Sequence, residues 1–477
     1  MYSSFFSYNV SRPYPFRWFT PVVVVGGIFV TIAISVISVS TSGYQLVSVS
    51  SSDANATEAG KTLFSRSLGP LIGSMRPACA SATIPLNTVM YTNNTAFRYS
   101  LTDVSMVDEY GSLKHQGSLV YHNNPLKNCT ISGIQIEFEG MQRPAANIAQ
   151  QMQGVSTLTS IGCNVETSQG TMTINLTAAY NYLPDDQALY NGKFSFLGRS
   201  ASTQGSLYWG ESLLLMYWLN LTNAFYLENK TPGFQFYKGS VSLSRDVSLP
   251  SDAADVESLD FFTNLGCYFL PFSGTSLEPL VEYCASSKLS DLVHASGDDD
   301  HPLPSIWTSV DTLSKALYYT ILTDLGQEDA LYINLLTDAT LLTYFTSNFT
   351  AINESVSADK HPWGENLGTD PALATAPFTD TIAAAFDLRV NPSVLTADYL
   401  CQIPQLKPTG SLIISVLIAD LVLLQTIWHV FQLVINYILG MRHPKMRFCE
   451  GCERSGSLLS DMEEETLKMG AYGAVSD

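Results

Sequence analysis

The residues best suited to chemistry in this sequence are cysteines in its central part. They are Cys79, Cys129, Cys163, Cys267, Cys284 and Cys401. An even number of cysteines in an oxidising compartment predicts up to three disulfides, with about 15 arrangements. Sequence order favours Cys129–Cys163 and Cys267–Cys284 as local bridges. Cys79–Cys401 would then join the two ends of the central region.

A second group of chemically notable residues lies inside an apolar C-terminal segment. It consists of Asp420, Gln425, His429, Gln432 and Asn436. The last four recur at spacings of four, three and four, so they share one stripe of a helix, with Asp420 roughly opposite. Two interpretations remain open: the stripe hydrogen-bonds within a contact between two packed helices, or it lines an aqueous path in an oligomer, with Asp420 or His429 facing ions.

An apolar N-terminal segment offers a matching helix face made of small residues. Spacings of four, four, three and four connect Gly27, Thr31, Ser35, Ser38 and Ser42. Faces of this kind let membrane helices approach each other closely.

Familiar catalytic and cofactor motifs are absent from the sequence. It contains no G-x-S-x-G elbow, H-E-x-x-H pair, G-x-x-x-x-G-K loop or EF-hand loop. Asp298-Asp299-Asp300-His301 could offer carboxylates to a divalent cation, but its position between glycine and two prolines favours a solvated loop. We therefore expect no catalytic residue, metal site or cofactor, and we lean against an enzyme.

Two apolar segments predict membrane-spanning helices, at about residues 21–40 and 410–439. Basic residues lie just outside both segments: Arg12 and Arg17 before the first, and Arg442, His443, Lys445 and Arg447 after the second. This charge pattern places the leader (1–20) and the tail (440–477) in the cytosol, and residues 41–409 on the extracellular or lumenal side. A cleaved signal peptide is the alternative for the first segment, and it would leave the central region on the same side.

A third apolar run, Ser206–Leu227, favours a different interpretation. Glu211 lies inside it, and so does the glycosylation triplet that begins at Asn220. A third crossing would also move the basic C-terminal cluster outside. We predict a buried helix of the ectodomain, with apolar residues at helical spacing.

Asn-x-Ser/Thr triplets support an extracellular or lumenal location for the central region. Eight lie between the two apolar segments and begin at Asn55, Asn93, Asn128, Asn175, Asn220, Asn229, Asn348 and Asn353. A ninth, at Asn9, lies in the expected cytosolic leader and should carry no glycan.

Two further cysteines, Cys449 and Cys452, follow the second apolar segment in a CEGC motif. Three interpretations compete: reversible acylation of juxtamembrane cysteines, free thiols, and a zinc site shared between chains. The last is the weakest, because two thiolates supply only half of a tetrahedral ligand set.

The ectodomain pattern predicts an α+β fold. Residues 41–75 resemble a stalk with one helix. From about 76 to 250 apolar and polar residues alternate, as in strands, for example at Ile134–Phe138 and Met172–Leu176. From about 251 to 400 the pattern becomes helical, with helices expected at Val310–Leu325, Asp329–Phe345 and Thr379–Phe386.

Charge limits the classes of partner. Between Thr41 and Thr409 there are 17 Lys and Arg against 35 Asp and Glu, so this region carries −18 of the chain's net −19. Nucleic-acid binding needs basic residues that neutralise phosphates, which makes such a partner very unfavourable. The acidic surface is expected chiefly to keep the ectodomain soluble.

Three local motifs carry a resemblance to known proteins. They are Pro13–Pro21 before the first apolar segment, Val120–Asn124, and Cys401–Leu406 before the second. With these and the CEGC motif, the chain resembles a family of uncharacterised two-pass membrane proteins of mushroom-forming basidiomycete fungi. The layout is also similar to that of ATP-gated and acid-gated trimeric cation channels, in topology only.

The sequence therefore favours a glycosylated membrane protein of the plasma membrane or secretory pathway. Its ectodomain would act as a cell-surface binding or structural module for an extracellular ligand or protein. A channel-like homo-oligomer is the first alternative, and a surface hydrolase is the least favoured.

Overall fold

The structure is a computed structural model that describes residues 19–42, 44–54, 78–107, 112–139, 154–167, 170–181, 199–230, 236–245, 252–271, 281–284, 286–295, 303–327, 333–358 and 376–442. The chain separates into two compact units. The terminal unit holds Met1–Val49, Asn55–Cys79 and Cys401–Asp477. The second unit, called the body below, holds Ser50–Ala54 and Ala80–Leu400.

The body is built on a nine-stranded antiparallel sheet with the strand order β12-β11-β10-β7-β8-β9-β4-β3, and β5 pairs with β4. The strands are β3 (Val89–Met90), β4 (Tyr99–Val107), β5 (Leu113–Gln116), β7 (Leu126–Glu139), β8 (Gly154–Thr167), β9 (Gly170–Asn181), β10 (Phe236–Ser244), β11 (Thr263–Pro271) and β12 (Glu282–Tyr283). A separate pair joins β2 (Ala82–Pro85) to β6 (Ser118–Tyr121). The predicted alternation is confirmed: Ile134, Ile136 and Phe138 on β7 are all buried.

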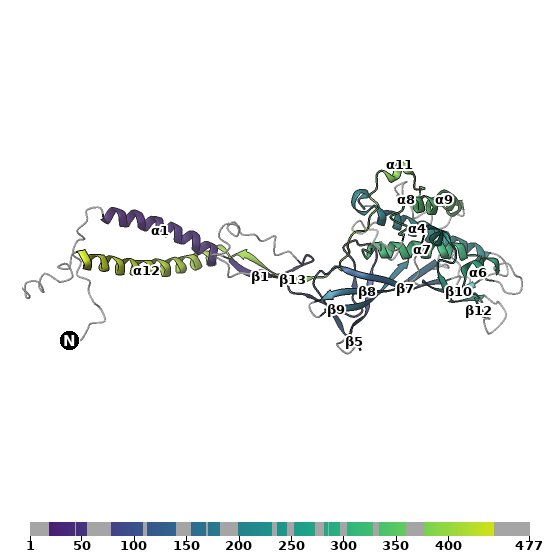
Figure 1. Ribbon diagram of the computed structural model, residues 1–477, viewed down its shortest axis with the longest axis horizontal. Coiled ribbons are helices and arrows are strands. Elements are labelled where there is room, and N and C mark those ends of the chain that lie inside the picture. The colour runs from purple at the N-terminus through teal and green to yellow at the C-terminus, as the bar shows by residue number, and fades with distance from the viewer. Residues whose placement is uncertain are drawn as a thin grey trace, which may run out of the picture. The chain divides into compact units, whose positions relative to one another are not determined.

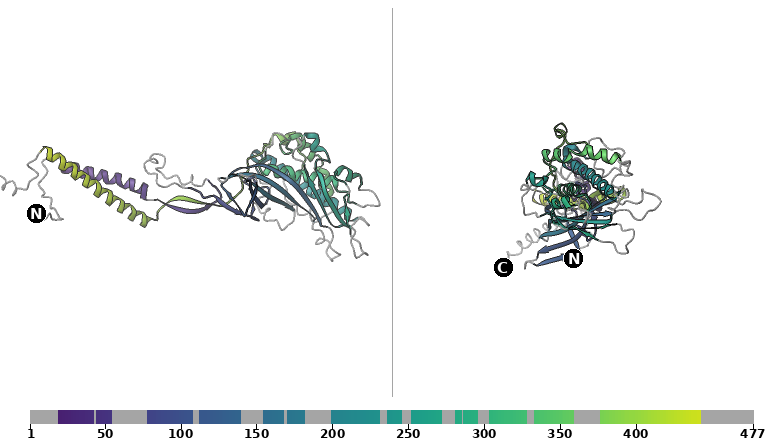
Figure 2. Two further views of the ribbon diagram at one scale, coloured as in Figure 1. Left: turned by 60° about the horizontal axis from the view of Figure 1, so that its bottom comes forward. Right: turned by 90° about the vertical axis from the view of Figure 1, so that its right-hand side faces the viewer.

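Helices cover one face of this sheet (Figures 1 and 2). The two long ones are α4 (Ala201–Lys230) and α7 (Trp307–Asp324), and α7 confirms the helix expected at Val310–Leu325. The shorter helices of the body are α5 (Ala253–Glu257), α6 (Leu289–Ala295), α8 (Ala339–Thr346), α9 (Phe349–Ala358) and α11 (Asp380–Ala383).

Helix α4 explains the third apolar run of the sequence. It is buried on nearly every side, with Leu213 and Trp218 fully enclosed, as expected for a helix that is apolar all round. The indole Nε1 of Trp218 donates a hydrogen bond to the Val155 carbonyl of β8 at 2.7 Å. At Gly210 a Cβ would lie 2.7 Å from Thr320 Oγ1, so glycine permits the close approach of α4 and α7. The prediction of a buried helix is therefore confirmed.

The described part of residues 41–75 includes a strand, β1 (Tyr44–Ser51), while residues 55–75, where the expected stalk helix could lie, are outside the described residues. One expected helix begins later in the structure than the sequence pattern indicates. The helix expected from Asp329 begins only at Ala339, because the Asp338 side chain accepts hydrogen bonds from the amides of Thr340 and Leu341 and caps α8. The predicted β-rich first half and helix-rich second half agree with the structure, and β11 and β12 of the second half join the same sheet as β7.

The terminal unit contains a helix from each end of the chain. Helix α1 (Phe19–Ser42) packs against α12 (Thr409–Arg442), and β1 pairs with β13 (Tyr399–Leu406). In the described residues one stretch, Thr409–Val434 of α12, is long and apolar enough to cross a membrane. Its mean hydropathy is 2.1, and its residues are not buried within the protein. The apolar stretch of α1, Val23–Val39, is shorter.

Candidate functional site

Three disulfides connect the six central cysteines: Cys79–Cys401, Cys129–Cys163 and Cys267–Cys284. These are the pairs that sequence order favours. Cys79 and Cys401 are separated by 322 positions and lie where the chain enters and leaves the body. The body is therefore a covalently closed loop of chain, whose two ends cannot separate while this bridge is intact.

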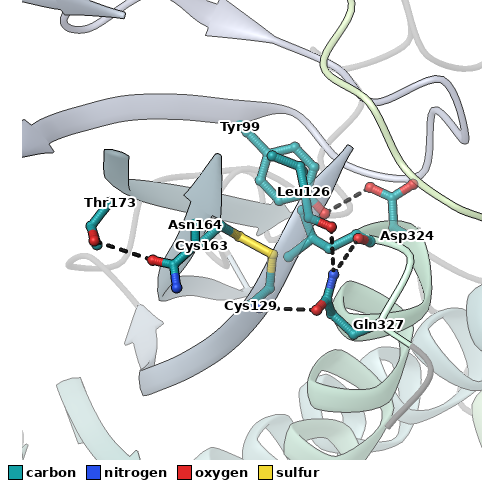
Figure 3. Close-up of a disulfide and its surroundings, with 9 residues drawn as sticks. Tyr99, Leu126, Cys129, Cys163, Asn164, Thr173, Asp324 and Gln327 are labelled. Atoms are coloured by element: carbon teal, nitrogen blue, oxygen red, sulfur yellow. Dashed lines mark hydrogen bonds between the residues drawn. A yellow bond between two sulfur atoms is a disulfide. The ribbon is translucent and has the colours of Figure 1, made fainter. Parts of the chain in front are cut away.

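The Cys129–Cys163 bridge joins β7 to β8 next to the C-terminal end of α7 (Figure 3). The Gln327 side chain lies beside it and uses both of its polar atoms. Its Oε1 accepts from the Cys129 amide at 3.0 Å, and its Nε2 donates to the Leu325 carbonyl at 2.7 Å. This glutamine therefore ties the end of the helix to the sheet at the disulfide.

Asp324, the last residue of α7, is fully buried close to this bridge (Figure 3). Its carboxylate accepts hydrogen bonds from the Tyr99 hydroxyl at 2.7 Å, from Thr92 Oγ1 at 2.9 Å and from the Ala96 amide at 2.9 Å. Burial raises the pKa of Asp324, and these three donors oppose that shift. The carboxyl group thus anchors α7 to the first residue of β4 and to the segment that precedes it.

A buried ion pair continues the network toward α4. Nε of Arg199 donates to both carboxylate oxygens of Glu211, at 2.8 and 2.9 Å, and the two side chains are 5% and 1% exposed. Asn94 connects this pair to Asp324, because its carbonyl accepts from Arg199 and its side-chain amide donates to the Asp324 carbonyl at 2.9 Å. Burial raises the pKa of Glu211 to about 8, and the charge of Arg199 opposes the shift.

A second buried pair lies on α7. Lys315 Nζ contacts Asp311 Oδ2 at 2.5 Å and also donates to the Ser258 carbonyl at 2.8 Å. Burial raises the pKa of Asp311 to about 7 and lowers that of Lys315, and their mutual attraction opposes both shifts. The guanidinium of Arg245 lies 3.7 Å above the Phe261 ring in the same region.

These buried groups suit a structural role better than catalysis. The side chains of the two ion pairs are at most 5% exposed, so a substrate in solvent does not reach them. Strongly perturbed carboxyl groups are typical of active sites, but structural ion pairs also perturb pKa values. Sequence analysis missed this network, although a glutamate within the apolar run at Ser206–Leu227 was a signal that a cationic partner must lie nearby.

The opposite face of the sheet is not covered by the long helices, since α4, α7, α8 and α9 all lie on one side (Figure 1). Its rows follow from strand register: Ser100, Thr177 and Ser160 are cross-strand partners, as are Thr173 and Asn164, whereas Ser105 opposite Thr173 is buried. These groups are hydroxyls and amides, and the same register also places Glu137 and the exposed Leu158 on this face.

Two tyrosines extend the open face at the β11–β12 edge. Tyr268 and Tyr283 are cross-strand partners, and Tyr283 is 71% exposed. The Cys267–Cys284 bridge immediately flanks both tyrosines and holds the two strands together. We call the surface made by Ser100, Ser160, Thr173, Asn175, Thr177, Tyr268 and Tyr283 the open sheet face.

The expected glycosylation sites differ in their environments. Five of the asparagines are exposed, namely Asn93, Asn128, Asn175, Asn348 and Asn353. Asn220 is half-buried and its amide donates to Ser309 Oγ at 3.0 Å, while Thr222 of the same triplet is buried. Asn55 lies outside the described residues, as do Cys449, Cys452 and the Asp298–His301 loop, and the side chain of Asn229 is not described.

The polar residues of the apolar C-terminal segment do not form one cluster. Asp420 faces α1, where its Oδ2 accepts a hydrogen bond from Ser35 Oγ at 2.6 Å, close to the buried Ser38. Gln425 and His429 are exposed and Gln432 is half-buried, while the side chain of Asn436 is not described. The contact between the two helices therefore uses Asp420, whereas Gln425 and His429 are exposed and make no described hydrogen bond within it.

Comparisons with protein-family models, with curated proteins and with solved structures find no match. Function must therefore be argued from the geometry of the chain itself.

Proposed function

We propose that this chain is an integral membrane protein that presents the body as a binding or structural module on the extracellular or lumenal side of a membrane. Both α1 and α12 would span that membrane, with the termini in the cytosol. The observation that carries the proposal is the apolar surface of α12, which is exposed along its length in a chain whose body is closed by disulfides.

The paired cysteines support the proposed side of the membrane. Disulfides persist in oxidising compartments and are rare in the cytosol. The basic residues outside each apolar segment support the same orientation. Helix α1, at 24 residues, would be about 36 Å long, enough for a bilayer core of about 30 Å.

The open sheet face is the surface we propose for binding. Hydroxyl and amide groups both donate and accept hydrogen bonds, and an exposed tyrosine adds an aromatic platform at one edge. This combination suits a neutral, hydroxyl-rich ligand such as an oligosaccharide. Because Asn175 lies on the same face, a glycan at this position would compete with such a ligand.

The test uses the full-length protein in lipid nanodiscs, after enzymatic deglycosylation, against a panel of soluble oligosaccharides. Tyr283→Ala should weaken binding about tenfold, as expected for an exposed aromatic contact. Tyr344→Ala is the matched control, because Tyr344 is 52% exposed but lies on α8. Equal affinities of the two variants, or no binding by the parent protein, would contradict a role for this face.

Membrane orientation is tested separately. Alkaline carbonate should leave the protein in the membrane pellet, and glycosidase should shift its mass only through asparagines between the two helices. Release of the protein into the supernatant would contradict the membrane assignment.

A further inference from the structure

The side of α12 roughly opposite the Ser35 contact carries polar groups that make no hydrogen bond among the described residues. Gln425, His429 and Gln432 form this surface, called the polar stripe below. Asp420 lies roughly opposite on the helix and bonds to Ser35 of α1. Within the described part of the chain, no hydrogen bond involves the side chain of any stripe residue. The inference that follows rests on the proposed membrane assignment.

The helix pair itself sets the depth of the stripe. The two helices run antiparallel, with the N-terminal end of α1 beside the C-terminal end of α12 (Figure 1). Starting at the Ser35–Asp420 contact, Pro21 lies 14 residues away on α1, about 21 Å. The same distance along α12 reaches Val434. In the other direction, Val39 is four residues from Ser35.

The α12 residues level with Pro21–Val39 of α1, the part expected to cross the bilayer, are therefore about 416–434, and Gln425 is halfway between them. His429 and Gln432 lie about 6 and 11 Å further toward the cytosolic edge. The beginning of α12 lies outside this range, in keeping with the hydrogen bond that Lys407 donates to Ser415 at 3.2 Å. The polar stripe thus begins near the centre of the bilayer, where lipid tails supply no hydrogen-bond partner.

We propose that the polar stripe is the contact between two copies of this chain. A glutamine amide carries both donors and an acceptor, so it can pair with the same amide of a second copy. A two-fold axis along the membrane normal would bring equal residues together at equal depth, as isologous interfaces require. The hydrogen-bonding groups of both stripes would then pair with each other, whereas an unpaired stripe would leave several polar groups without partners in hydrocarbon.

Cysteine cross-linking in intact membranes tests this contact. With Cys449 and Cys452 replaced by serine, the full-length variants Gln425→Cys and His429→Cys are oxidised with a membrane-permeant catalyst. Both should form disulfide-linked pairs of twice the chain mass. The control is Val430→Cys. Val430 is 55% exposed and lies at nearly the same depth as His429, but on another side of the helix. It should remain monomeric.

A second measurement does not depend on introduced cysteines. Replacing the three stripe residues together by leucine keeps the helix apolar and removes the shared hydrogen bonds. Co-purification of two differently tagged copies should fall about tenfold, which corresponds to the loss of two or three interhelical hydrogen bonds. Val430→Leu with Val434→Leu should have no effect.

Several outcomes would overturn the proposal. They are cross-linking at Val430→Cys as strong as at Gln425→Cys, no cross-linking at either stripe position, or a cross-linked product that contains a different protein. Carbonate extraction is measured on the same membranes. Protein that stays in the pellet without pairing refutes the contact alone, whereas protein that is released refutes the membrane assignment.

Discussion

Replacing Asp324 separates its role as a hydrogen-bond acceptor from its charge. The carboxylate accepts bonds from the Tyr99 hydroxyl, the Thr92 hydroxyl and the Ala96 amide, all in the buried interior. Asp324→Leu leaves these three donors unpaired. At about 1 to 2 kcal/mol for each unpaired buried donor, the free energy of unfolding should fall by about 3 to 6 kcal/mol.

Asp324→Asn provides the matched control. Its carbonyl oxygen can accept from Thr92 and Ala96, and its amide can donate to the Tyr99 hydroxyl, which is also an acceptor. All three contacts are kept without a charge, so we expect a change of less than about 1 kcal/mol at neutral pH.

The pH dependence adds a signed test of the same residue. Burial raises the pKa of Asp324 above its ordinary value of 3.8, so the unfolded chain loses this proton at lower pH than the folded body. Protonation of the folded carboxyl group contributes stability that is complete below the ordinary pKa of 3.8. This stability is lost as pH rises through the higher pKa of the folded state. Because asparagine has no proton to lose, its stability relative to the parent protein should improve as pH rises.

The assay is guanidinium unfolding of the full-length protein in detergent, followed by tryptophan fluorescence. Trp209, Trp218 and Trp307 are fully buried in the body and report its unfolding. Equal losses for the leucine and asparagine variants would refute the argument from hydrogen bonding. An asparagine variant whose relative stability falls with rising pH would refute the sign of the pKa shift.

Three further predictions use other parts of the body. Gly210→Ala should destabilise it by about 1 to 3 kcal/mol because the new methyl group meets α7, whereas Gly117→Ala, with open space around it, should not; chemical unfolding compares the two. Asn220→Gln should leave the glycosylated mass unchanged, since that asparagine is engaged inside the body, whereas Asn353→Gln should lower the mass by one glycan if that exposed site is occupied. Cys401→Ser should lower the unfolding free energy by about 6 kcal/mol in the chain-entropy model, because the bridge closes a separation of 322 residues; a loss below about 1 kcal/mol would contradict that account.

Local patterns in the sequence were sufficient for several elements. Alternation at Ile134–Phe138 predicted a strand with one buried face, and β7 confirms it. The apolar run at Ser206–Leu227 contains a glutamate, and this residue distinguished a buried helix from a membrane span. Both inferences depend on residues that are neighbours in sequence, where periodicity directly reflects burial.

Other features depend on contacts between distant segments. The acceptors and donors around Asp324 come from residues 92–99, more than 220 positions earlier in the chain. No spacing rule connects them, so the buried network could not be predicted. The early start expected for α8 was wrong for a local reason, because the capping preference of Asp338 outweighs the apolar periodicity before it.

By itself, the sequence determined which segments are apolar enough to lie in a membrane or a core, and how many cysteines are available for pairing. These properties follow from composition and from contacts along the chain. Only the tertiary structure decided that Asp420 turns toward Ser35 and leaves Gln425 and His429 exposed. Helical periodicity shows which residues share a face, but the packing of α1 against α12 selects which face is covered.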